Sequence, residues 1–340
     1  MVYHSLKNLQ RKPYFMVKFQ RPAVKAAARS TLSESPDQAR KLILLHTGAS
    51  LLLAILLSVL DFLLEQKIGT TGGLSGISTR STLTTMQTLL RYIQLLALPV
   101  WNCGYLFALL RLSRQENADE RSLLSGFSRF GPVLRLTLLK AAIYFAIGLI
   151  CVYIASAIFL ATPWAQPLLD ALEPMVASGE VSQEQLLAAT DAVALPMILI
   201  FSGLFLLACT PVFYLLRVTD FCIMDDERKG ALAALLESLR LTRGNRMALL
   251  KLDFSFWWFY ALELLISLLC YGDLLLTTLG VQLPWSGNVS YFVFLGVYAA
   301  SQLLLYTWKK NHVFLTYAHA YNALKTSTDT SILPTFPWNG

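Results

Sequence analysis

The chain has 340 residues, of which 55% are hydrophobic and only 14% are charged. Soluble domains carry roughly a quarter charged residues, so this composition excludes an ordinary water-soluble domain. The formal net charge is +7, but the basic residues cluster beside hydrophobic runs, which favours anionic lipid headgroups over nucleic acid as their partner.

Six segments predict membrane-spanning helices, because each holds about 20 mostly apolar residues, enough to cross a hydrocarbon core of roughly 30 Å. In chain order they are residues 42–64, 92–110, 136–160, 194–216, 249–271 and 291–308. The predicted fold class is therefore all-α: a polytopic transmembrane helical bundle of six spans in three hairpins, with amphipathic interfacial helices. Residues 1–35 form a basic amino-terminal extension, residues 36–325 the transmembrane domain and residues 326–340 a tail.

Lys and Arg are distributed unevenly between the two ends of these spans. Of the 28 Lys and Arg residues, all but Lys67, Arg80 and Arg91 belong to the segments at one end. Cytoplasmic segments of membrane proteins keep this excess of positive charge. We therefore expect a multi-pass protein of the cell membrane with both termini in the cytoplasm.

The connections between the spans differ in character. The first span has a start signal, with Ser35 as an N-cap, Pro36 at the first helical position and Gln38 completing a capping box. Residues 1–34 interleave basic and aromatic residues, which favours a tether to anionic lipid over the alternative, a protein-docking arm. Residues 69–85, rich in Gly, Ser and Thr, predict an exposed outer loop, and residues 161–190 predict short helices on the outer surface.

Two basic segments on the expected cytoplasmic side, residues 122–140 and 234–251, resemble each other. In the second, leucines recur at helical spacing and Gly244 is placed to end the helix. We expect this helix to lie flat on the inner leaflet. Its candidate contacts to lipid headgroups are Arg240, Arg243, Arg246 and Lys251.

Glu263 is the ionisable residue that stands out in the predicted spans. It follows Asp253 by ten residues, or roughly 15 Å along a helix, which places it near the middle of the membrane. A carboxyl at that depth is costly, which favours a role in proton or cation coupling. The alternative is a protonated carboxyl bonded to a neighbouring helix, for instance at Tyr298. Gln302 and Asn102 complete this possible intramembrane polar site, and interhelical hydrogen bonding is their alternative role.

The sequence holds no pattern of a known catalytic site. HExxH, GxSxG, GxGxxG and the Walker lysine loop are all missing from it. We therefore predict no catalytic residues, no cofactor and no metal, and expect the protein not to be an enzyme. A lone histidine such as His46 is expected to be a packing residue.

The motifs of residues 125–131 and 220–258 resemble a bacterial family of uncharacterised membrane proteins, domain of unknown function number nine hundred and seventy-five. They comprise Ser125-Gly126-Phe127, Phe130-Gly131, the acidic run 220–226, Ser238, Arg243-Gly244-Asn245-Arg246, residues 250–256 and Trp258. The resemblance covers roughly residues 40–325 and implies a six-helix membrane fold with no assigned activity. A more distant similarity links the chain to the membrane region of some glycerophosphodiester phosphodiesterases, without their catalytic domain.

Two functions follow as hypotheses. The first is a non-enzymatic scaffold or accessory subunit of a bacterial inner-membrane system for export, immunity or envelope stress. The second is a small-solute or lipid transporter that uses Glu263. The partners expected in either case are anionic lipids and other membrane proteins, not nucleic acid. An intramembrane enzyme is the third alternative.

Overall fold

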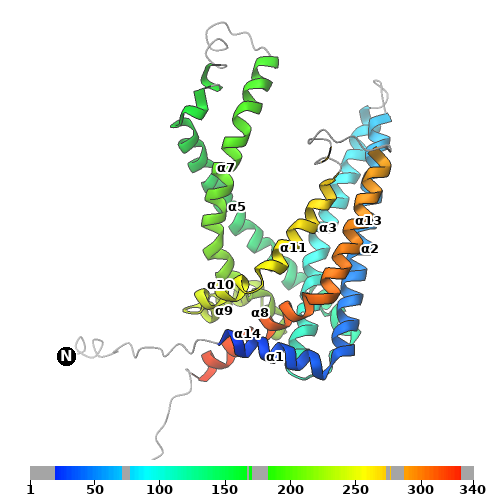
Figure 1. The fold of residues 1–340 in the computed structure, drawn as a ribbon, viewed down its shortest axis with the longest axis vertical. Helices are drawn as coiled ribbons and strands as arrows, with labels where there is room; N and C mark the ends of the chain where they lie inside the picture. Colours follow the sequence, from blue (N-terminus) through cyan, green and yellow to red (C-terminus); the bar gives the residue numbers. More distant parts are fainter. Residues whose placement is uncertain are drawn as a thin grey trace, which may run out of the picture. The chain divides into compact units, whose positions relative to one another are not determined.

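The computed structural model describes residues 20–70, 77–166, 168–170, 183–272, 276 and 287–330 (Figure 1). Every regular element in these ranges is a helix. The chain divides into two compact units: residues 1–134 together with 218–340 form unit 1, and residues 135–217 form unit 2. The all-α class predicted from the sequence is confirmed.

Five helical stretches of the described chain are long and apolar enough to cross a membrane. They lie, in order, along α2 (Pro36–Thr70), α3 (Ile77–Ser113), α5 (Phe130–Leu160), α7 (Gln183–Leu216) and α13 (Gly287–Leu305). They include predicted spans one to four and six, with α2 and α3 reaching well beyond the expected ends. The protein is therefore a multi-pass membrane protein.

The fifth predicted span is interrupted. Instead of one helix from 249 to 271, the chain forms α10 (Arg246–Phe254), a break, α11 (Trp257–Leu268) and the short 3-10 helix η4 (Leu269–Tyr271). The break buries Phe256, whose ring meets His312 and Tyr317 at centroid distances of 5.6 and 6.4 Å. From Trp257 to Tyr271 an α-helical rise would cover only about 22 Å, so this apolar helix is shorter than the other spans.

Most of the remaining helices of unit 1 gather at one end of its spans, which we name the basic end (Figure 1). They are α1 (Arg21–Glu34), η2 (Glu120–Leu124), α4 (Ser125–Ser128), α8 (Thr219–Asp225), α9 (Ala231–Thr242), α10 and α14 (Asn311–Thr330). Helix α1 packs against α14, where the Thr31 hydroxyl meets the His319 Nε2 at 3.0 Å. Part of the amino-terminal extension is thus a docked helix, while residues 1–19 and 331–340 lie outside the described chain.

The connections between the spans differ in part from those predicted from the sequence. Helix α2 does begin at Pro36, but Gln38 donates to the Asn117 side chain at 3.0 Å instead of closing a capping box. The expected outer loop 69–85 is largely helical, because α2 continues to Thr70 and α3 starts at Ile77. Residues 71–76, 167 and 171–182 lie outside the described ranges, while the second expected outer segment, 161–190, begins with the short helix η3 (Pro163–Ala165) and ends in the first turns of α7.

Two glycines let α3 meet η2 and α4 backbone to backbone. A Cβ atom on Gly126 of α4 would lie 2.0 Å from the Val100 carbonyl oxygen, and one on Gly104 of α3 would lie 1.9 Å from the Leu123 carbonyl oxygen. Only glycine permits this approach, since no side chain then separates the helices. The contact explains physically the Ser125-Gly126-Phe127 motif noted in the sequence.

Candidate functional site

Three carboxylates at or near the basic end each accept a hydrogen bond from a tyrosine of the last helical stretch. Tyr306 donates to the Glu263 Oε1 at 2.5 Å, Tyr321 to the Asp225 Oδ2 at 2.8 Å, and Tyr317 to Asp253. We call Tyr306, Tyr317 and Tyr321 the tyrosine row. The row ties α8, α10 and α11 to residues 306–321, because each tyrosine hydroxyl bonds an acid on one of these helices.

Asp225, at the end of α8, forms ion pairs with two cations in addition to its hydrogen bond from Tyr321. Its side chain is only 2% exposed and pairs with the Arg114 guanidinium at 2.5 Å and with the Lys325 ammonium. Burial acts to lower the pKa of Arg114, but the hydrogen bond and charge of Asp225 raise it above its ordinary value. Arg114 also donates to the Asn322 side-chain oxygen at 3.1 and 3.2 Å. The cluster thus fastens the end of α3 to α8 and α14.

Arg129, between α4 and α5, binds backbone carbonyl groups at the carboxyl end of α8. Its guanidinium donates to the carbonyl oxygens of Ile223, of Glu227 at 2.9 Å and of Lys229 at 3.3 Å. These carbonyls lie in the last turn of α8 or just beyond it, where backbone acceptors have no helical donors. One planar guanidinium can serve several of them together, which a lysine ammonium cannot do in the same geometry.

His46 is a packing residue of α2, as the sequence suggested. It is 1% exposed and stacks on Trp101 and Tyr105 at centroid distances of 5.6 and 4.3 Å. Its Nε2 lies 3.1 Å from the Asn102 Oδ1, so Asn102 joins α3 to α2. On the other side of this cluster the Tyr105 hydroxyl donates to the Asn311 Oδ1 at 2.7 Å.

Lys310 is a buried cation that sequence reasoning did not single out. It ends the single π-helical turn η5 (Tyr306–Lys310) between α13 and α14. Its side chain is 8% exposed, and the ammonium lies 3.9, 5.6 and 5.7 Å from the ring centroids of Tyr306, Tyr105 and Phe314. No carboxylate among the described residues comes within ion-pair distance of it. Aromatic faces lie against the charge and help to stabilise it, and π turns of this kind recur at functional sites.

Of the predicted intramembrane group around Glu263, the structure identifies Tyr306 as a hydrogen-bond partner that the sequence did not suggest. Tyr298, Gln302 and Tyr306 follow one another at intervals of four residues on the same helical stretch. Gln302 is buried, and its Oε1 has no hydrogen-bond partner among the residues that the structure describes. The 15 Å depth estimated for Glu263 assumed an unbroken helix from Asp253, which the break between α10 and α11 removes.

The four candidate headgroup contacts lie on the surface of α9, α10 and the turn between them. Arg240, Arg243, Arg246 and Lys251 are all exposed. Large apolar side chains are exposed beside them: Leu232, Leu236, Met247 and Phe254, at 56–68%. As predicted, α9 ends before Gly244, whose φ of 80° lies in the left-handed region that favours glycine.

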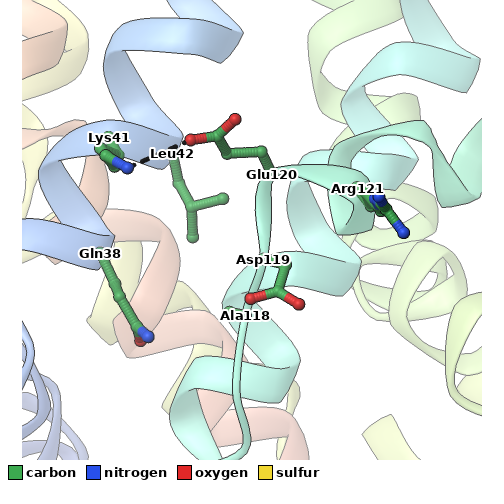
Figure 2. Close-up of a pocket in the computed structure, with 7 residues that line it drawn as sticks. All are labelled: Gln38, Lys41, Leu42, Ala118, Asp119, Glu120 and Arg121. Atoms are coloured by element: carbon green, nitrogen blue, oxygen red, sulfur yellow. Dashed lines mark hydrogen bonds and ion pairs between the residues drawn. The ribbon is translucent and has the colours of Figure 1, made fainter.

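An open hollow of about 450 Å³ lies where α2 begins and the chain enters η2 (Figure 2). Lys41 and Glu120 form an ion pair across it at 3.2 Å, with side chains 71% and 59% exposed. An ion pair so open to solvent contributes little to stability or binding. The other lining residues are Gln38, Leu42, Ala118, Asp119 and Arg121.

The clusters contain no arrangement typical of catalysis or metal binding. No three His, Cys, Asp or Glu side chains come together as metal ligands in the described ranges. The residues that sequence reasoning missed, Arg114, Lys325 and the tyrosine row, have partners that are distant in the chain. Asp225 lies 111 residues from Arg114 and 100 from Lys325, and only the acidic run 220–226 signalled that this segment mattered.

Comparisons with known proteins give one match. A family described as "Protein of unknown function (DUF975)" matches residues 20–307, a range that begins just before α1 and ends within the π turn. No curated protein and no solved structure matches the chain, and the distant similarity to glycerophosphodiester phosphodiesterases is not shown by these comparisons. Because the match covers far more than half of the sequence, the chain belongs to this family of proteins of unknown function.

Proposed function

We propose that this protein is a non-enzymatic scaffold or accessory subunit of a bacterial inner-membrane system, such as one for export, immunity or envelope stress. Both termini lie in the cytoplasm, and the basic end faces the anionic inner leaflet. The orientation is supported by the distribution of Lys and Arg, because only three of the 28 fall outside the segments at one end of the spans.

The observation that carries this proposal is the engagement of the carboxylates by the tyrosine row. Glu263, Asp225 and Asp253 each accept a tyrosine hydroxyl from residues 306–321. Acids held this way fix helices against one another. The exposed face of α9 and α10 adds a surface that suits anionic lipid.

Affinity purification from native membranes in mild detergent tests the scaffold proposal. A tagged wild-type chain is compared with an equally expressed, equally tagged unrelated multi-pass protein. We expect one or more membrane proteins to co-purify in fixed proportion with the chain and not with the control. Recovery of the chain alone, together with solute uptake by proteoliposomes that contain only this protein, would overturn the proposal.

Transport of a small solute or lipid is the second candidate, and Lys310 is the observation that favours it. The buried ammonium lies against the Tyr306 ring, and the Tyr306 hydroxyl bonds Glu263. One tyrosine therefore lies between a carboxylate and a buried ammonium, and paired ionisable groups of this kind mark ion pathways in membrane proteins. A proteoliposome flux that is lost in Glu263→Gln and in Lys310→Met, while both variants keep the wild-type melting temperature, supports transport; equal flux in all three proteins rejects it.

A further inference from the structure

The sequence of residues 246–271 gives no reason for the interruption of the fifth span. The segment contains neither Gly nor Pro, and a helix without them usually breaks where a side chain or water enters its ladder of backbone hydrogen bonds. Yet α10 and α11 run in different directions (Figure 1), and residues 255 and 256 between them belong to neither helix. The cause of the break therefore lies outside this segment.

The backbone hydrogen bonds at the break are displaced by one residue. In an unbroken helix the Ser255 N–H would bond the Lys251 carbonyl oxygen, four residues earlier. It bonds the Leu252 carbonyl oxygen instead, at 3.0 Å. Likewise, the Phe259 N–H bonds the Phe256 oxygen at 2.9 Å and not that of Ser255. The carbonyl oxygens of Lys251 and Ser255 have thus lost their helical donors.

Two cations of α1 take the place of these donors. The Arg21 guanidinium donates to the Lys251 oxygen at 3.4 Å, and the Lys25 ammonium donates to the Ser255 oxygen at 3.5 Å. The Lys25 ammonium also lies 4.2 Å from the Phe256 ring centroid. Arg21 and Lys25 are one helical turn apart, so both project from the same side of α1. Their positive charge is favourable at the carboxyl end of α10, because the helix dipole is negative there.

The attachment of α1 is weak, as expected of an element that can move. Of its 14 residues only Val24, Ala28 and Thr31 are buried, and Thr31 adds the contact with His319. Both hydrogen bonds to the break are longer than the usual range of roughly 2.7–3.2 Å. As one helix, residues 246–271 would rise about 39 Å, enough to cross the membrane. An unbroken fifth span is therefore available to the chain once α1 leaves.

We propose that α1 is a releasable strap on the fifth span. When α1 is docked, its cations replace the donors that the break removes, and the span stays in two pieces. When α1 is released, the oxygens of Lys251 and Ser255 regain their own helical donors, and residues 246–271 close into one helix. The strap thereby controls the helix that carries Glu263, the acid bonded to Tyr306. It requires neither the scaffold role nor transport.

Distances between paired spin labels on the full-length protein test the strap, measured by pulsed electron paramagnetic resonance in a background without the natural cysteines. One pair, Met247→Cys with Leu264→Cys, brackets the break at side chains that are 63% and 64% exposed. In a continuous helix this pair would lie about 26 Å apart, whereas the change of direction at the break makes the distance shorter. A second pair, at the exposed residues Ser30 and Thr326, reports whether α1 stays docked on α14.

The double variant Arg21→Gln with Lys25→Gln should release the strap. We expect its second distance to become long and broad, and its first distance to rise to about 26 Å. The matched control, Arg29→Gln with Arg40→Gln, removes the same charge from exposed residues of α1 and α2 and should keep both wild-type distances.

The single variant Lys25→Gln keeps the test decisive if the double variant does not fold. With Arg21 still in place, it should show the distance of about 26 Å in part of the population. If every folded variant keeps the short first distance, the strap is overturned, whether or not α1 stays docked. A change of the same size in the control would overturn it as well. None of these outcomes depends on a protein partner or on solute flux, so the strap and the proposed function can fail separately.

Discussion

Replacing Gly126 by alanine should break the contact between α3 and α4. The added Cβ would lie 2.0 Å from the Val100 carbonyl oxygen and 2.9 Å from the Gly104 nitrogen, and real Cβ atoms essentially never approach closer than 3.0 Å. Both neighbours are backbone atoms, so the helices must separate by about 1 Å. Overpacking of this kind costs about 1–3 kcal/mol, and alanine's better helix propensity returns at most about 1 kcal/mol.

The assay is thermal melting of the detergent-solubilised protein, followed by the fraction that remains monodisperse. With a net cost near 2 kcal/mol, Gly126→Ala should melt roughly 4–8 °C below the wild type. Gly131→Ala is the matched control, because it lies in the same connection and a Cβ there meets nothing within 4 Å. If Gly126→Ala melts like Gly131→Ala, the reasoning about backbone contact is refuted.

Three further substitutions test the polar clusters by the same melting assay. Asp225→Asn should destabilise the protein by about 1–3 kcal/mol, less than the loss of a fully buried ion pair, because the cationic partners of Asp225 are 32% and 34% exposed. The control Asp226→Asn, at an acid that is 41% exposed, should change the melting temperature little. Equal effects of the two substitutions would contradict the Asp225 cluster. Arg129→Lys should cost about 1–2 kcal/mol because an ammonium cannot reproduce the planar donor geometry with which the guanidinium reaches these carbonyls, and an unchanged melting temperature would exclude this role. Tyr306→Phe should destabilise the protein more than Glu263→Gln, since glutamine still offers an acceptor to Tyr306 while phenylalanine leaves the Glu263 carboxyl without its donor. The reverse order would show that this hydrogen bond is unimportant.

The spans were predictable because the bilayer imposes one rule on all of them: about 20 apolar residues whose backbone bonds are made within the helix. The interruption at residues 255–256 was not predictable from apolar content, because it depends on tertiary packing. Phe256 turns inward to meet His312 and Tyr317, and the Lys25 ammonium of α1 lies 4.2 Å from its ring centroid. None of these partners is adjacent in the sequence.

In the candidate site too, features that depend on neighbouring residues could be predicted, and features that depend on distant residues could not. Helical spacing correctly placed Gly244 at the end of α9, and Arg240 and Arg243 on its surface, because these properties depend on neighbours within a few residues. The partner of Glu263 was a different matter. Tyr298 and Tyr306 are two helical turns apart on one face of the same helical stretch. The sequence therefore identifies the face that Glu263 contacts, but not which of the two tyrosines lies opposite it. The pairing with Tyr306 required the structure.

Thiol labelling in intact cells tests most directly the claim that the basic end faces the cytoplasm. In a background without the natural cysteines, Ser81→Cys places an exposed thiol near the start of α3, and Arg228→Cys places one between α8 and α9. A membrane-impermeant reagent should label the cysteine at position 81 in intact cells, and the cysteine at position 228 only after permeabilisation. Labelling of position 228 from outside, with position 81 protected, would contradict the account.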